Sequence, residues 1–330
     1  MRIIAETAGT LPVISAIIRI FANAVCLGVH KHRVTTMKPV QQNSARAWLL
    51  AARPKTLTAA LIPVIAATAL AVADGRFRPA AAALCAVFAS LMQVAANFIN
   101  DLFDFLKGTD REDRLGPERA CAQGWISPRV MRWGIGATIV PACAVGLGLL
   151  AYGGWWLVGI GAACVVFAFL YTTLLSYCGL GDLLVWAFFG LVPVAATYYV
   201  QAGAVTAPVW WVAAACALAV DTLLVVNNYR DRETDRAAGK RTLIVALGGR
   251  FGSLFYLGQG LAAYGCAAAL ALYGYRWTAL FPLLYVVLHV RTWRTMVRIG
   301  KGRALNGILG ATSRNMFLFA VLLALALCLS

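Results

Sequence analysis

Hydrophobic residues come in long runs along this chain, and short polar segments separate one run from the next. A run of about 20 apolar residues allows a helix to cross the hydrocarbon core of a bilayer. The pattern after Trp48 predicts nine such helices, at residues 56–74, 79–100, 130–151, 155–175, 180–200, 208–228, 251–273, 277–297 and 307–329. Alternating strand patterns are absent from the sequence, which argues against a membrane β-barrel. The predicted fold class is all-α: a polytopic membrane protein of about nine transmembrane helices.

Residues 47–330 are predicted to form a single membrane domain, preceded by an N-terminal extension of residues 1–46. An apolar stretch at 11–29 carries one central arginine, and a basic group follows it. Three interpretations are open: an interfacial helix, a targeting segment, or translated sequence upstream of a start at Met37. We prefer the last, because the membrane pattern begins cleanly at Trp48.

The composition supports a membrane protein. Of the 330 residues, 61% are hydrophobic and 13% are charged, a balance that does not suit a water-soluble domain. The net charge of +16 comes from Lys and Arg between the apolar runs, a pattern that indicates positive-inside loops and not nucleic-acid binding. The nine cysteines lie mostly inside predicted spans with no CxxC pair, so we interpret them as small apolar residues. His289 is expected to be a hydrogen-bonded interior residue and not a metal ligand.

Two polar clusters follow the ends of predicted spans. The first contains Asn97, Asn100, Asp101, Asp104, Asp110 and Asp113, and the second contains Asn227, Asn228, Asp231, Glu233 and Asp235. In the first cluster Asn97, Asp101 and Asp104 are spaced i, i+4 and i+7, so they share one face of a helix. In the second cluster Asn227, Asp231 and Asp235 share a face through the spacing i, i+4 and i+8. Carboxylates on one face repel each other, and hard cations such as Mg²⁺ or Ca²⁺ relieve this repulsion through oxygen ligands. One such face alone is more often a solvated helix end. Two acidic helix faces directed at one cavity would hold metal ions against a multiply charged oxyanion such as a diphosphate.

The distribution of Lys and Arg gives the orientation. Loops 101–132 and 229–250 carry six each and loop 298–306 carries three, whereas the opposite side has only Arg76, Arg78 and Arg276. The positive-inside rule therefore places both clusters on the cytoplasmic side of the plasma membrane. Successive spans cross the membrane in opposite directions. This alternation places the two clusters on the same side without any use of the Lys and Arg counts.

Asp221 lies inside the sixth predicted span. An ionisable side chain there is costly, so it should face the interior of the bundle. Two interpretations remain open: an internal hydrogen bond to a neighbouring helix, and a role in a substrate cavity.

Five stretches carry motifs that occur together in one known family. They are RPKTL at 53–57, NDLFD at 100–104 with GTD at 108–110, DRLGPER at 113–119, GLGD at 179–182 and NNYRDRETDRAAGKRTL at 227–243. With these motifs the chain resembles, over about residues 46–329, the UbiA superfamily of intramembrane aromatic prenyltransferases. Their combination is far more specific than a single DxxD. Two features depart from the family: Thr58 stands where Pro is usual, and the segment 171–182 is short and lacks the usual Gly and Pro.

The resemblance implies a helical bundle around a central cavity and transfer of a polyprenyl chain from its diphosphate to an aromatic ring. The likeness is greatest to members that act on 1,4-dihydroxy-2-naphthoate, which lose CO₂ and diphosphate and give demethylmenaquinone. Other acceptors, such as 4-hydroxybenzoate or homogentisate, remain alternatives. From another class, a cation-coupled transporter is an alternative, but transporters place charged sites near the bilayer midplane. A purely structural membrane subunit is a third alternative, but it does not explain why two helices carry similarly spaced aspartates.

The resemblance also assigns residues and partners. Expected ligands of Mg²⁺, the implied cofactor, are Asp101, Asp104, Asp110, Asp231 and Asp235, and all of these except Asp110 are expected to be catalytic. Expected substrate-binding residues are Asn97, Asn100, Lys55, Arg114, Arg119, Asn227, Asn228, Lys240, Arg241 and Tyr171. Candidate wall residues for an allylic cation are Tyr171, Tyr177, Trp186, Phe188 and Tyr199. Expected partners are polyprenyl diphosphate, the naphthoate and membrane lipid, without nucleic acid.

Overall fold

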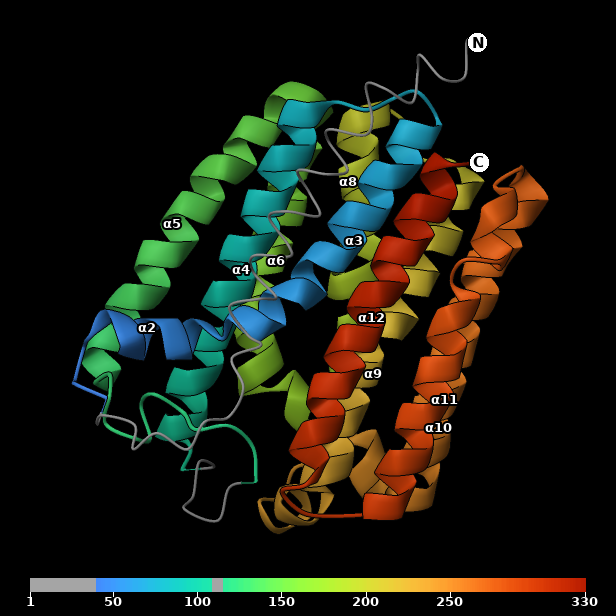
Figure 1. The fold of residues 1–330 in the computed structure, drawn as a ribbon. Helices are drawn as coiled ribbons and strands as arrows, with labels where there is room; N and C mark the ends of the chain where they lie inside the picture. The colour runs from blue at the N-terminus through green and yellow to red at the C-terminus, as the bar shows by residue number, and fades with distance from the viewer. Residues whose placement is uncertain (1–39, 109–114) are drawn as a thin grey trace.

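The computed structural model describes residues 40–108 and 115–330, and these residues form helices and loops without a strand. The long helices run side by side as one bundle, and the short helix α2 lies across one end of it (Figure 1). In chain order they are α2 (Ala45–Ala52), α3 (Pro54–Ala73), α4 (Pro79–Leu106), α5 (Pro128–Gly153), α6 (Trp156–Thr173), α7 (Gly181–Trp186), α8 (Val192–Ala202), α9 (Ala207–Ala237), α10 (Leu243–Ala269), α11 (Leu283–Ile299) and α12 (Leu305–Cys328). The interpretation of residues 1–39 lies outside the described residues.

The predicted spans coincide with helices in the structure, so the all-α membrane fold is confirmed. Within residues 40–108 and 115–330, eight helical segments are long and apolar enough to cross a membrane. The predicted span 277–297 is the exception, because its helix, α11, has only 17 residues and contains Arg291, Arg294 and Arg298. A 3₁₀ turn at Arg276–Ala279 and Pro282 precede α11, so the helix begins later than predicted. The count of nine is therefore approximate, and the chain is a multi-pass membrane protein.

Local sequence signals fix where the helices begin. α3, α4 and α5 each start at a proline, which has the backbone angle of a helix and no N–H group to leave unpaired. The Ser127 hydroxyl accepts from the Val130 N–H (3.4 Å) before α5, and the Thr242 hydroxyl accepts from the Val245 N–H (3.2 Å) before α10. These side chains satisfy N–H groups that the helix itself leaves free.

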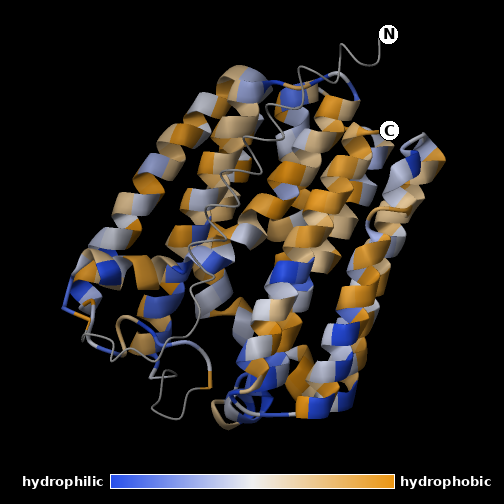
Figure 2. Ribbon diagram, in the orientation of Figure 1, coloured by the Kyte–Doolittle hydropathy of each residue, from blue (hydrophilic) through white to orange (hydrophobic). Residues whose placement is uncertain are grey.

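Two helices continue beyond their predicted ends and carry the polar clusters. α4 extends from the predicted end at 100 to Leu106, and α9 extends from 228 to Ala237. Hydrophilic residues gather at the end of the bundle where these helices finish (Figure 2). The described members of each cluster therefore share one helix, as their spacing predicts, and both clusters lie at the same end of the bundle.

Interior polar residues and cysteines behave as expected from the sequence. The buried His289 of α11 donates its Nε2–H to the Tyr256 carbonyl (3.1 Å), and its ring stacks on the Tyr256 ring with centroids 4.5 Å apart. The cysteines in the described part of the chain form no disulfide with one another. Residues before α2 also contact the bundle, since the Asn43 N–H donates to the Trp125 carbonyl (2.8 Å).

A π-helical turn interrupts the span between Gly181 and Ala202. This turn, Ala187–Leu191, joins α7 to α8 and contains Gly190. Gly190 packs directly on α9: a Cβ atom there would lie 2.3 Å from the Ala217 Cβ and 2.5 Å from its Cα. The close approach of the two backbones therefore requires glycine.

We expect Gly190→Ala to lower the free energy of unfolding by about 1–3 kcal/mol, because the added methyl group must displace the α9 backbone. The check is thermal unfolding of the purified protein in detergent. Gly159→Ala in α6 is the matched control, because its Cβ would meet nothing within 4 Å. An equal melting temperature for the two variants would contradict this packing.

Candidate active site

Asn97 links α4 to the start of α3 at the polar end of the bundle. Its Nδ2 donates to the Ala52 carbonyl (2.9 Å) and to the Thr56 hydroxyl (2.8 Å). Asn100 contacts a different helix, because its Oδ1 accepts from the Thr172 hydroxyl of α6 (3.1 Å). The two asparagines thus fix α4 between α3 and α6.

Asp101 is 1% exposed and binds a loop rather than an open site. The Ala120 N–H donates to its Oδ2 (2.9 Å) and the Cys121 N–H donates to its Oδ1 (2.8 Å). The Arg53 guanidinium lies 3.7 Å from Oδ2. Both carboxylate oxygens of Asp101 therefore hold the backbone that follows Arg119.

Asp104, one turn along α4, forms an ion pair with Arg119. The Arg119 Nη2 donates to the Asp104 Oδ2 at 2.9 Å, and Arg119 is buried. Because Asp101 binds the N–H groups of the next two residues, it fixes the position from which Arg119 reaches Asp104. The two carboxylates of the first cluster act on the same loop.

In the second cluster, Asp231 is paired with its neighbour Arg230. The guanidinium binds both carboxylate oxygens, with Nε to Oδ1 at 2.7 Å and Nη2 to Oδ2 at 2.5 Å. Its remaining Nη1 donates to the Asn306 Oδ1 of α12 (2.8 Å), and the Asn306 Nδ2 donates to the Leu115 carbonyl (2.8 Å). This chain of hydrogen bonds connects the second cluster to the loop of the first.

Asp235 has one oxygen near a lysine and one without a partner. Its Oδ1 lies 3.7 Å from the Lys240 Nζ, and its buried Oδ2 has no hydrogen-bond partner within the described residues. Four aspartates of the clusters thus have a basic neighbour; the pairs are Asp101–Arg53, Asp104–Arg119, Asp231–Arg230 and Asp235–Lys240. The site is charge-balanced by the chain's own residues.

The segment between α6 and α7 contacts residues that follow both clusters. Beyond α4, the Lys107 Nζ donates to the Thr173 carbonyl (2.5 Å) and lies 4.0 Å from the centroid of the Tyr177 ring. Beyond α9, the Arg241 N–H donates to the Tyr177 carbonyl (3.1 Å). Gly179 has φ +78°, and a Cβ there would lie 2.8 Å from the Arg241 carbonyl oxygen, so glycine is required.

Lys107 indicates how near the two clusters are to each other. Desolvation lowers the pKa of its ammonium group, Asp104 of the first cluster raises this pKa, and Lys240 beyond the second cluster lowers it. Lys107 is therefore within electrostatic range of both clusters.

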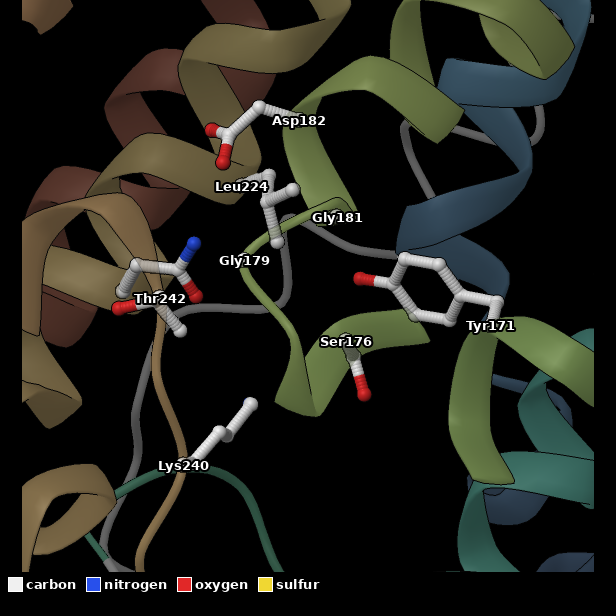
Figure 3. A pocket seen from close by; sticks show the side chains of 9 residues that line it. Tyr171, Ser176, Gly179, Gly181, Asp182, Leu224, Lys240 and Thr242 are labelled. Carbon is white, nitrogen blue, oxygen red and sulfur yellow. The ribbon is translucent and has the colours of Figure 1, made fainter. Parts of the chain in front are cut away.

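A polar pocket lies beside the second cluster. It is lined by Tyr171, Ser176, Gly179, Gly181, Asp182, Leu224, Asn228, Lys240 and Thr242. In Figure 3, Asp182 and Lys240 lie at opposite ends of the pocket, and Tyr171 faces it from the side. Tyr171 is within electrostatic range of Asp104 of α4 and Asp235 of α9. Asn228 of the second cluster therefore lines the pocket directly, and Asp104 of the first cluster acts on it through its charge.

The donor groups of the two clusters fit a hard divalent cation. Carboxylate and amide oxygens are the ligands that Mg²⁺ prefers, and Asp235 presents a buried oxygen without a partner. Within residues 40–108 and 115–330, no three His, Cys, Asp or Glu side chains converge on one point. Asp104, Asp231 and Asp235 could each contribute a ligand to Mg²⁺ if they exchanged their basic neighbours for the metal.

The other predicted binding residues differ in burial and in whether they line the pocket. Asn228 and Lys240 line the pocket, and Asn227 is half-buried on α9. Lys55 is exposed on the first turn of α3, and Arg241 is exposed and contributes its backbone N–H. The predicted residues Asp110 and Arg114 lie outside the described residues.

The predicted aromatic walls are only partly assembled at the pocket. Tyr171 lines it, and Tyr177 lies beneath the Lys107 ammonium group. Phe188 packs on Phe167 with ring centroids 4.8 Å apart. Tyr199, in the last turn of α8, packs edge-on against Trp156 at the start of α6, also at 4.8 Å.

Three residues with evident roles at the site were not assigned from the sequence. Asp182 stands in the GLGD motif, which was a usable signal, and it lines the pocket. Arg230 is adjacent to Asp231, but its bidentate contact could not be inferred from adjacency. Asn306 is an isolated polar residue at the start of the last span and gave no signal.

Comparisons with known proteins agree with this architecture. The model of the UbiA prenyltransferase family matches residues 60–306. The chain is 34% identical over 309 residues to a 1,4-dihydroxy-2-naphthoate octaprenyltransferase of Escherichia coli (strain K12), covering 89% of this chain and 99% of that protein. It is also 34% identical over 288 residues to the protein of the same name from Mycobacterium tuberculosis, covering 85% and 96%.

Two solved structures have the same fold. One is the apo structure of a UbiA homologue from Aeropyrum pernix K1, with a TM-score of 0.62 and 17% identity, covering 83% of this chain and 97% of that chain. The other is a UbiA homologue from Archaeoglobus fulgidus bound to GPP and Mg²⁺, with a TM-score of 0.60 and 16% identity, covering 86% and 100%. The fold therefore persists where little of the sequence does.

Proposed function

The chain belongs to the UbiA prenyltransferase family, and from this premise we propose that it transfers a polyprenyl chain from its diphosphate to 1,4-dihydroxy-2-naphthoate. Carbon dioxide and diphosphate leave, and the product is demethylmenaquinone in its reduced quinol form. The observation that carries this proposal is a polar pocket lined by Asn228 and Lys240, whose Tyr171 lies within electrostatic range of Asp104 and Asp235. Such a site can bind a diphosphate at one side and an aromatic ring beside it.

Mg²⁺ is the cofactor we propose, held by Asp104, Asp231 and Asp235. Bound there, it would supply positive charge to the diphosphate oxygens as the allylic C–O bond breaks. When these carboxylates turn to the metal, Arg119 and Lys240 lose their present partners and can donate to diphosphate oxygens. We assign Asp101 a positioning role, because both its oxygens already accept backbone N–H groups.

The residues of the pocket would protect the electron-poor allylic carbon. The Tyr171 ring borders the pocket, and an aromatic face stabilises a nearby cation. The surrounding helices and the bilayer exclude water, which would otherwise capture this carbon. The prenyl tail is as apolar as lipid and would extend between the helices.

We further propose that residues 47–330 form one catalytic domain of the cytoplasmic membrane, with the pocket facing the cytoplasm. The loops rich in Lys and Arg lie at the end of the bundle that carries the pocket. The positive-inside rule supports this orientation. Labelling of single cysteines in this end and in the opposite end, in intact cells, would test it.

The experiment that tests the proposed function is a membrane assay with 1,4-dihydroxy-2-naphthoate and a polyprenyl diphosphate. We expect prenylated naphthalenediol, CO₂ and diphosphate in equal amounts with Mg²⁺, and none with EDTA. Product only with another phenol would keep the prenyltransferase and replace the acceptor. Absence of transfer to any aromatic by intact protein would refute the proposal.

Asn306→Ala is expected to raise the Mg²⁺ concentration for half-maximal activity by roughly 10-fold, as is typical for residues that orient metal ligands. The physical reason is that Arg230 loses its hydrogen bond to α12 and no longer holds Asp231 in place. Asn306→Asp keeps the acceptor for Arg230 and should retain most of the affinity. Identical Mg²⁺ titrations for Asn306→Ala and the parent protein would exclude this positioning role.

A further inference from the structure

The carboxyl group of Asp182 is a feature of the pocket that the chemistry above does not use. Its side chain is 3% exposed, and its Oδ1 has no hydrogen-bond partner within the described residues. It lines the pocket from the first turn of α7, at the end opposite Lys240 (Figure 3). Buried polar atoms are nearly always hydrogen-bonded, and an unpaired one destabilises the fold. A ligand that donates a hydrogen bond here would remove that cost.

A second buried carboxyl group, Asp221 of α9, lies within electrostatic range of Asp182. Its Oδ2 accepts from the Trp186 indole N–H (3.0 Å) and from the Gln259 amide of α10. The internal hydrogen bonds considered for Asp221 are thus present. Asp182 and Trp186 are four residues apart on α7, so both side chains face α9. Asp221 thereby fixes the contact between helices that sets the position of Asp182.

This pair of carboxyl groups differs from the acidic clusters in having no cation beside it. In those clusters Asp101, Asp104, Asp231 and Asp235 each have an Arg or Lys within 4 Å. Neither Asp182 nor Asp221 has an ion pair in residues 40–108 and 115–330. A carboxyl group without a cationic neighbour is suited to a neutral donor, such as a hydroxyl group, and not to a diphosphate.

We propose that Asp182, positioned by Asp221, binds a ring hydroxyl group of the aromatic acceptor. The proposal rests on the proposed function, in which the diphosphate lies toward Lys240. The acceptor carbon that attacks the prenyl group must then lie between Lys240 and Asp182, beside Tyr171. A hydroxyl group on the far side of the ring donates to the Asp182 Oδ1. Asp182 and Asp221 together thereby favour aromatic acceptors that carry this hydroxyl group.

The test measures Asp182→Ala with 1,4-dihydroxy-2-naphthoate and with two inhibitors, 1-hydroxy-2-naphthoate and 4-hydroxy-2-naphthoate. We expect the KM of the acceptor to rise roughly 10- to 100-fold, while the KM of the polyprenyl diphosphate changes less than about threefold. In the parent protein, the inhibitor that lacks the bound hydroxyl group should bind more weakly than the other. In Asp182→Ala this difference should disappear, because the partner of that hydroxyl group is gone.

Control variants separate recognition from folding. Asp182→Asn keeps the size of the side chain and a carbonyl oxygen, which accepts a hydrogen bond more weakly than a carboxylate. We therefore expect a smaller rise in the acceptor KM than in Asp182→Ala. This variant also provides the test if Asp182→Ala does not fold. Asp74→Asn alters a carboxyl group at the C-terminal end of α3, which accepts from the Tyr275 hydroxyl (2.5 Å) and does not line the pocket, and it should leave the acceptor KM unchanged.

Two results would overturn the proposal: an unchanged acceptor KM in both Asp182 variants, or an equal loss of affinity for the acceptor and both inhibitors. If the parent protein prenylates a different phenol, the proposed acceptor is wrong. The same comparison with that phenol and its deoxy analogue then still tests the role of Asp182.

Discussion

Asp231→Asn is expected to lower the rate of prenyl transfer by at least about 10²- to 10³-fold, the size of effect seen when one group that stabilises developing charge is removed. Asparagine keeps the shape of the side chain but lacks the negative charge that would hold Mg²⁺. Arg230 retains its hydrogen bond to Asn306, so the bundle should stay folded. Initial rates in membranes at saturating Mg²⁺, together with thermal unfolding in detergent, check both parts.

Glu233→Gln is the matched control for this prediction. Glu233 lies two residues away on α9, is exposed, and loses the same charge. We expect it to transfer prenyl groups at the parent rate. Normal transfer by Asp231→Asn, or an equal loss in both variants, would contradict a metal-binding role specific to Asp231.

Asp101→Asn should affect both activity and stability, unlike Asp231→Asn. An asparagine accepts through one oxygen only, so either the Ala120 or the Cys121 N–H is left buried without a partner. An unpaired buried donor costs about 1–3 kcal/mol, and we expect the melting temperature to fall by several degrees. Transfer should also fall by at least roughly 10-fold, because Arg119 loses its fixed position beside Asp104.

Asp104→Asn provides the comparison for Asp101→Asn. It removes the ion pair with Arg119 but no bond to the loop backbone, so activity should be lost with a smaller change in melting temperature. Protease susceptibility of residues 115–126 should rise in Asp101→Asn only. If Asp101→Asn unfolds at the parent temperature while transfer is lost, Asp101 acts as a metal ligand and not as a positioning residue.

Helix spacing predicted which residues share a helix but not what each side chain contacts. Asn97, Asp101 and Asp104 lie on α4 as expected, yet they bind α3, the loop beyond Arg119 and Arg119 itself. Spacing determines the direction of a side chain around the helix axis. The partner is set by chain segments that fold back from elsewhere in the sequence, and no local pattern specifies them.

The same limit explains why Asn306 and the Asp182–Asp221 pair emerged only from the structure. Asn306 contacts Arg230 and Leu115, which precede it by 76 and 191 positions. Asp221 was recognised as an interior group from its apolar surroundings, but its neighbour on α7 was not. By contrast, the spans themselves depend on the length and hydropathy of local segments, so they could be predicted closely.

The three arginines of α11 have a consequence for how the chain enters the bilayer during synthesis. Each arginine near the centre of an inserting helix opposes partition into lipid by about 2.5–3.5 kcal/mol. α11 therefore has little tendency to leave the translocon alone. Its contacts with α12, including the Asn315 Nδ2 to Thr292 hydroxyl bond (2.9 Å), provide polar groups with partners. We therefore expect α11 and α12 to enter the lipid together, as a helical hairpin.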